Sequence, residues 1–99
     1  MKTLALSEIK RVLPNNKITQ PIDEFAGLRA AVSIVLRVRA GSIEILFIVR
    51  ALRESDPWSG QIAFPGGHSE LQDQSMRETA ERETIEETGI DLNKVANYL

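Results

Sequence analysis

Hydrophobic residues gather in two stretches in the first half of the chain, at 30–36 and 43–49. Both stretches are rich in β-branched side chains, which favour extended strands. A short turn at 40–42 contains a glycine, so the sequence predicts an antiparallel hairpin with strands at 29–39 and 43–50. Because apolar residues are dense along these strands, we expect both of their faces to be at least partly covered.

The N-terminal residues follow a different pattern. Ser7 precedes apolar residues at helical spacing, and Pro14 follows them, which predicts a short helix capped by Ser7. Residues 15–27 mix Asn, Pro, Asp and Gly with few apolar side chains, as in a connecting arm. We therefore divide the chain into an N-terminal helix and arm at 1–28 and a main domain at 29–99.

Beyond the hairpin, the polar and Pro/Gly-containing stretch 51–60 indicates a loop. A short strand is predicted at 61–64, followed by a sharp Pro-Gly-Gly turn at 65–67. Residues 90–99 read as a turn and the start of a further strand.

A helix is predicted from Met76 to Thr88, a segment without Gly or Pro. Ser75 and Glu78 have the spacing of a capping box at its start. Gly89 stands where a left-handed residue commonly ends a helix. Both ends of this helix are therefore marked in the sequence.

Composition narrows the class of protein. A chain of 99 residues with a net charge of −2 forms one domain at most and has no basic stripe for a nucleic acid. It has no cysteine, which excludes disulfides, thiolate zinc sites and a cysteine nucleophile. Its apolar stretches are far shorter than the ~20 residues that cross a bilayer. We expect a cytoplasmic protein with no membrane partner.

The predicted helix carries the candidate chemistry. Glu83, Glu86 and Glu87 stand at i, i+3 and i+4, so they project from one face. Like charges this close repel, and Arg82 alone cannot neutralise three carboxylates. A hard divalent cation with oxygen ligands would offset the repulsion. The alternative from spacing alone is an ordinary solvated polar face.

A longer pattern contains these glutamates: Gly67-x5-Asp73-x8-Arg82-Glu83-x2-Glu86-Glu87-x-Gly89-Ile90. It resembles the Nudix box, usually Gly-x5-Glu-x7-Arg-Glu-U-x-Glu-Glu-x-Gly-U with U a bulky apolar residue, and spans 67–90. Asp73 replaces the first Glu, one extra residue precedes Arg82, and Thr84 fills the first U position. The first two departures resemble the coenzyme A diphosphatase-like branch. We expect Thr84 merely to pack less well than leucine.

An upstream motif of that branch is matched in part. Residues 46–51 resemble its beginning, and Gly60-x3-Phe64-Pro65-Gly66-Gly67 matches its end. The middle differs, because Asp56-Pro57-Trp58-Ser59 occupies a stretch that is one residue longer than in the motif. Coenzyme A is therefore one candidate substrate among several.

The resemblance implies a Nudix-type α/β/α sandwich with a mixed sheet, which we expect to be incomplete at the C-terminus. It also implies that Glu83, Glu86 and Glu87 bind Mg²⁺ or Mn²⁺. The backbone carbonyl of Gly66 would add a metal ligand, and Arg82 would orient the glutamates. Glu83 or Glu86 would take the proton of the attacking water, although several Nudix families hold this base outside the box.

Four further residues are candidates for substrate contacts: Arg50, Trp58, Phe64 and Gly67. Arg50 would meet a phosphate, or would be a plain charge at a strand end. Trp58 would stack on an adenine, or would cap the edge of the core. Phe64 also suits the core, and Gly67 also suits a tight turn with positive φ.

The predicted activity is metal-dependent hydrolysis of the diphosphate bond in a nucleoside diphosphate linked to another moiety, with coenzyme A or a derivative as first candidate. ADP-ribose or another nucleotide derivative is the alternative. A non-catalytic Nudix-like module that binds a nucleotide is a second one. The expected partners are a small nucleotide and a second copy of the chain that completes the sheet.

Overall fold

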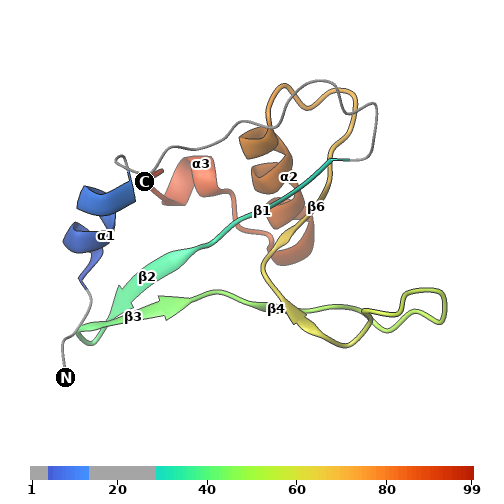
Figure 1. The fold of residues 1–99 in the computed structure, drawn as a ribbon, viewed down its shortest axis with the longest axis horizontal. Helices are drawn as coiled ribbons and strands as arrows, with labels where there is room; N and C mark the ends of the chain where they lie inside the picture. The colour runs from blue at the N-terminus through green and yellow to red at the C-terminus, as the bar shows by residue number, and fades with distance from the viewer. Residues whose placement is uncertain (1–4, 14–28) are drawn as a thin grey trace.

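The computed structural model describes residues 5–13 and 29–99. In chain order the elements are α1 (Leu6–Val12), β1 (Ala30–Val32), β2 (Leu36–Arg39), β3 (Ser42–Ile45), β4 (Ile48–Val49), β5 (Ile62–Ala63), β6 (Gly66–His68), α2 (Met76–Thr88) and α3 (Leu92–Val95). The strands form three antiparallel pairs, β1 with β6, β2 with β3, and β4 with β5. Figure 1 shows α2 beside β1 and β6, the two strands that it contacts most.

The predicted hairpin is confirmed in β2 and β3, which pair from Leu36 opposite Ile45 to Arg39 opposite Ser42. Its turn consists of Ala40 with φ 50° and Gly41 with φ 79°. Two consecutive residues of positive φ give a turn whose twist matches the twist of the flanking strands.

The prediction of two continuous strands is wrong, because each one changes partner along its length. The first divides into β1 and β2, and Ser33 beyond β1 still donates its N–H to the carbonyl of Pro65 at 2.8 Å. The second divides into β3 and β4, and β4 pairs with β5 through Val49 opposite Ile62. β propensity indicates an extended backbone but does not determine which strand pairs with it.

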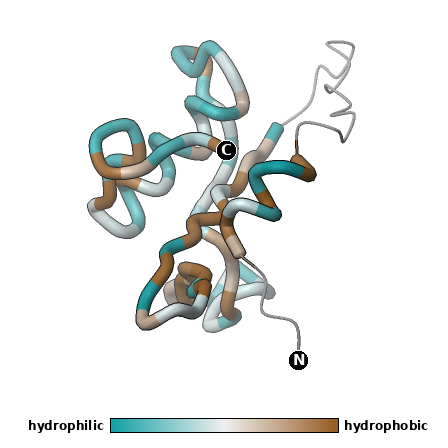
Figure 2. Tube along the Cα trace, turned by 90° about the vertical axis from the view of Figure 1, so that its left-hand side faces the viewer, coloured by the Kyte–Doolittle hydropathy of each residue, from teal (hydrophilic) through white to brown (hydrophobic). Residues whose placement is uncertain are grey.

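The expectation of covered strand faces is also wrong within the described residues. Exposed apolar side chains on or beside the strands are Val32, Ile34, Val38, Ile45, Phe47, Val49 and Ile62. Hydrophobic positions recur along the trace in Figure 2. Among the described residues, the largest fully buried side chains are Thr79 and Thr84 of α2 and Pro65 before β6. The described core therefore lies where α2 covers β1 and β6.

The N-terminal helix is confirmed, but its predicted cap is wrong. Ala5 occupies the N-cap position of α1, and no side chain forms a capping hydrogen bond at this end of the helix. Ser7 lies inside the helix instead. The predicted arm at 15–27 lies outside the described residues. None of the helices in the described part of the chain has the length and hydropathy needed to cross a membrane.

Candidate functional site

The helix α2 begins and ends as the sequence predicts. The hydroxyl of Ser75 accepts a hydrogen bond from the N–H of Glu78 at 3.0 Å, and the Glu78 carboxylate accepts one from the N–H of Gln74 at 3.1 Å. Gly89 has φ 77°, and its N–H donates to the carbonyl of Ile85 at 2.8 Å. These caps therefore define the two ends of α2.

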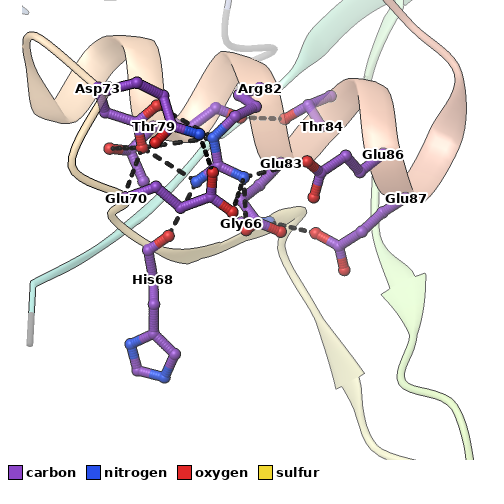
Figure 3. A network of polar contacts seen from close by, with 12 residues as sticks. Gly66, His68, Glu70, Asp73, Thr79, Arg82, Glu83, Thr84, Glu86 and Glu87 are labelled. Atoms are coloured by element: carbon purple, nitrogen blue, oxygen red, sulfur yellow. Dashed lines mark hydrogen bonds and ion pairs between the residues drawn. The ribbon is translucent and has the colours of Figure 1, made fainter.

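Arg82 connects two of the predicted metal-binding glutamates. Its Nη1 donates to Glu83 Oε1 at 3.0 Å and to Glu86 Oε1 at 3.1 Å. Figure 3 shows these carboxylates along one side of α2 together with Glu87. Such charge-assisted hydrogen bonds offset part of the repulsion between neighbouring carboxylates. The structure thus brings Arg82, Glu83 and Glu86 together as the sequence pattern predicts.

Asp73 anchors the other side of the Arg82 guanidinium, a role that the sequence did not reveal. Its carboxylate accepts Arg82 Nε and Nη2, both at 3.0 Å, Thr79 Oγ1 at 2.9 Å and the N–H of Glu70 at 2.9 Å. Its side chain is only 3% exposed. The hydrogen bond from Arg82 is the largest cause that holds the pKa of Asp73 below its usual value.

The guanidinium of Arg82 is held in turn by several oxygen atoms around it. The hydrogen bond with Asp73 is the largest cause that raises the pKa of Arg82. Nη2 also donates to the carbonyl of His68 at 2.9 Å, and Nη1 lies 3.4 Å from Glu70 Oε1. His68 contributes this backbone carbonyl, and its ring points away from the carboxylates (Figure 3). Arg82 therefore ties α2 to the segment that precedes it.

The two glycines of the predicted turn belong to strand β6, and neither has a positive φ. They are required for close approach instead. A Cβ on Gly67 would lie 2.6 Å from Cδ of Glu83, and one on Gly66 would lie 2.3 Å from the carbonyl oxygen of Ala31. The N–H of Gly66 donates to Glu87 Oε1 at 2.8 Å. β6 thus positions the Glu83 and Glu87 carboxylates.

The other predicted substrate residues lie between β4 and β6, outside the strands. Arg50 Nη2 donates to Asp56 Oδ2 at 2.6 Å, and Asp56 Oδ1 accepts the backbone N–H of Trp58 at 2.9 Å. Trp58 is 61% exposed. Phe64 instead stacks on Phe47, with ring centroids 5.0 Å apart. Arg50 and Trp58 are therefore joined through Asp56, whereas Phe64 has an aromatic partner within the protein.

Comparison with known protein families identifies the chain. The NUDIX domain family matches residues 27–99, which include every element from β1 to α3. The chain belongs to the Nudix family. Its helices and small antiparallel strands agree with the α/β fold of that family. The predicted resemblance to Nudix proteins is thereby confirmed.

Two proteins are similar to this Nudix chain in sequence. An uncharacterized protein of Schizosaccharomyces pombe is 54% identical over 50 residues, which cover 50% of this chain and 15% of the relative. A mitochondrial coenzyme A diphosphatase of Mus musculus is 37% identical over 65 residues, which cover 66% of this chain and 31% of the relative. The chain therefore aligns with less than a third of either relative.

Nudix enzymes generally use divalent cations such as Mg²⁺ or Mn²⁺. Within residues 5–13 and 29–99, no three Asp, Glu or His side chains converge as a cation site. The donor type nevertheless fits, because hard cations prefer carboxylate oxygens. Glu83, Glu86 and Glu87 each use Oε1 for their contacts with Arg82 or Gly66. Their second carboxylate oxygens take no part in these contacts.

Thr84 fills a position that is apolar in the usual Nudix box, and it does more than pack. It is fully buried, and its hydroxyl lies 2.7 Å from the carbonyl of Ala80 and 3.0 Å from the hydroxyl of Ser33. Ser33 Oγ also donates to the Ala80 carbonyl at 3.3 Å. These contacts join α2 to the residue that follows β1. Sequence reasoning missed them because residues 33 and 84 are far apart in the chain.

Proposed function

We propose that this chain hydrolyses the diphosphate bond of a nucleoside diphosphate linked to another moiety, with Mg²⁺ or Mn²⁺ as cofactor. The observation that carries the proposal is the row of Glu83, Glu86 and Glu87 on α2, organised by Arg82 and β6. A row of carboxylates suits a cation that bridges the protein to phosphate oxygens. Family membership supports the same class of hydrolase.

Each residue would have a distinct role. Glu83, Glu86 and Glu87 would hold the cation, whose chemistry is to neutralise charge on the diphosphate and to activate water. Water would attack one phosphorus atom, its oxygen would form the new P–O bond, and the bridging P–O bond would break. The leaving phosphate would depart with the bridging oxygen.

The base that accepts the proton of the attacking water is Glu86 in this proposal. Its side chain is 53% exposed, whereas that of Glu83 is 19% exposed and lies against Gly67. A base must reach water or substrate within hydrogen-bond distance. Glu83 would then act mainly as a ligand that β6 holds in place.

Coenzyme A or a derivative is the leading substrate in this proposal. The mouse relative is a coenzyme A diphosphatase, and residues 60–67 match the end of the upstream motif of that branch. ADP-ribose and other nucleotide derivatives are the second candidate, favoured by the pairing of Arg50 with Asp56 in the stretch that departs from the motif. The substrate-binding roles of Arg50, Trp58 and Gly67 belong to the same proposal.

A substrate screen tests the proposed function. The full chain is incubated with Mg²⁺ or Mn²⁺ and with coenzyme A, ADP-ribose, dinucleoside polyphosphates or nucleoside triphosphates, and the products are separated by chromatography. We expect cation-dependent release of a nucleoside phosphate from at least one diphosphate compound. Binding of a nucleotide without turnover of any compound would favour the non-catalytic alternative and would contradict the proposal.

A further inference from the structure

The loop 51–60 closes on Arg50 through the backbone. The N–H of Arg50 donates to the carbonyl of Gln61 at 2.9 Å, and its own carbonyl accepts the N–H of Gly60 at 2.9 Å. These bonds continue the pairing of β4 with β5. Arg50 is therefore fixed at the mouth of the loop, and its side chain can interact with residues of the loop itself.

Asp56 reaches back from the loop to this arginine. The N–H of Asp56 donates to the carbonyl of Arg53 at 3.1 Å, and its carbonyl accepts the N–H of Ser59 at 3.2 Å. One carboxylate oxygen accepts from Arg50 at 2.6 Å and the other from the N–H of Trp58 at 2.9 Å. The Asp56 side chain is 19% exposed and that of Arg50 is 42% exposed. Asp56 is thus held by the loop, and the Arg50 side chain remains partly accessible to solvent.

The strands connect this arginine with the row of glutamates. β4 ends just before Arg50 and pairs with β5, and β5 leads through residues 64–65 to Gly66, whose N–H donates to Glu87 Oε1. The hydrogen bond that Arg50 donates to Asp56 is the largest cause that raises the pKa of Arg50, and the negative charge of Glu87 also raises it. A guanidinium beside a diphosphate site commonly binds phosphate through the same charge-assisted hydrogen bonds that it forms with a carboxylate. A substrate phosphate that accepts from two guanidinium nitrogens would therefore compete with Asp56 for Nη2 and for the positive charge of Arg50.

We propose that Asp56 is a specificity-determining residue that competes with a substrate phosphate for the guanidinium of Arg50. The inference rests on the proposed function, because it assumes a nucleotide at the glutamate face of α2. A built-in competitor weakens binding of the more anionic ligands and so selects among related substrates. Asp56 would disfavour nucleoside diphosphate derivatives that carry an additional phosphate monoester.

A binding experiment tests this competition without any turnover. ADP is titrated into the full chain in the presence of Mg²⁺, and binding is followed by the fluorescence of Trp58, the one tryptophan of the sequence. We expect Asp56→Asn to bind ADP about fivefold more tightly, since loss of an exposed charge competitor is a modest effect. Asp56→Ala removes the carboxylate without leaving an amide in its place, and this variant should also bind ADP more tightly.

Two control variants separate competition from other effects. Glu54→Gln removes the same charge from an exposed position of the same loop and should leave the affinity within about twofold. Adding Arg50→Gln to Asp56→Asn should abolish the gain. Equal gains in Asp56→Asn and Glu54→Gln, or unchanged or weaker binding in both Asp56 variants, would overturn the proposal.

Turnover separates this inference from the proposed function. If the chain is a hydrolase, Asp56→Asn should raise the ratio of kcat/KM for coenzyme A to that for its 3′-dephospho form by about fivefold. An unchanged ratio would overturn the role of Asp56 while leaving the hydrolase intact. A chain without hydrolysis would contradict the proposed function, and the ADP titrations would still decide the role of Asp56.

Discussion

Arg82 and Asp73 form a nearly buried charged pair beside the glutamate row. Asp73 receives two nitrogens of the guanidinium in a nearly buried position. The remaining nitrogen, Nη1, donates to Glu83 and Glu86. The Arg82 side chain thus connects the nearly buried carboxylate of Asp73 with the carboxylates of Glu83 and Glu86 in the candidate site.

The lowered pKa of Asp73 makes stability depend on pH. Because its pKa is lower in the folded protein, the unfolded chain binds more protons between the two values, and stability rises with pH there. The contribution is present above the ordinary aspartate value of about 4 and is lost as the pH falls below it. We expect Asp73→Asn to flatten this acid dependence in urea unfolding between about pH 3 and pH 7. Equal slopes for both proteins would contradict this account.

The buried hydroxyls of Thr84 and Ser33 predict a coupled effect on stability. Thr84→Val keeps the shape but removes a hydroxyl from a fully buried position, which should cost about 1–2 kcal/mol of the free energy of unfolding. Because Ser33 shares these contacts, Ser33→Ala should cost less in the Thr84→Val background than alone. Urea unfolding of the four proteins gives the coupling, and purely additive costs would show that the two hydroxyls act independently.

At the level of elements, α2 supplies the row of glutamates and β6 holds it. Replacing Glu87 by Gln removes a proposed metal ligand and the charged acceptor for the N–H of Gly66. We expect kcat/KM on the substrate found in the screen to fall at least ~100-fold, since lost charge stabilisation of several kcal/mol has this effect. Glu78→Gln on the same helix is the control, because glutamine also serves in a capping box. Similar activity in both variants would be inconsistent with a metal-binding role for Glu87.

Elements whose signals are local could be predicted from the sequence. Ser75 and Gly89 mark the ends of α2, and both act on backbone groups within four residues. The turn at 40–41 is local in the same sense. The breaks within the two long strands could not be predicted, because they depend on which distant strand pairs with each part. The same reason explains why the predicted covering of the strand faces was wrong.

The candidate site was predictable to a similar extent. The spacing of Glu83, Glu86 and Glu87 is by itself enough to place their side chains on one face of a helix. In the sequence, Asp73 stands out only because it replaces the first glutamate of the Nudix box. Its role as a partner of Arg82 depends on a contact that forms on folding. The pairing of Arg50 with Asp56 also requires the loop to fold back. Helical periodicity reveals a face of a helix but not the groups that meet it.

At the scale of the whole molecule, apolar side chains on the strands are open to solvent. Val49 is 71% exposed and Ile62, its neighbour across β4 and β5, is 70% exposed. Exposed apolar surface of this kind favours association with another protein surface. We therefore expect the chain to self-associate, with a second copy covering these strands.

Light scattering over a range of protein concentrations tests the expected self-association. Val49→Thr combined with Ile62→Thr should lower the average mass at a given concentration, because it removes apolar contact while β-branched residues preserve the strands. Leu71→Thr, at a fully exposed position outside the strands, is the control and should leave the mass unchanged. A wild-type chain that stays monomeric at every concentration would refute the expectation.

Binding of Mn²⁺ tests the central claim most directly. The full chain is titrated with Mn²⁺ in the presence of ADP, and the free cation is followed by its electron paramagnetic resonance signal. The account predicts saturable uptake by the wild type and its loss when Glu83, Glu86 and Glu87 are all replaced by Gln. Equal uptake by both proteins, or no uptake by the wild type, would contradict it.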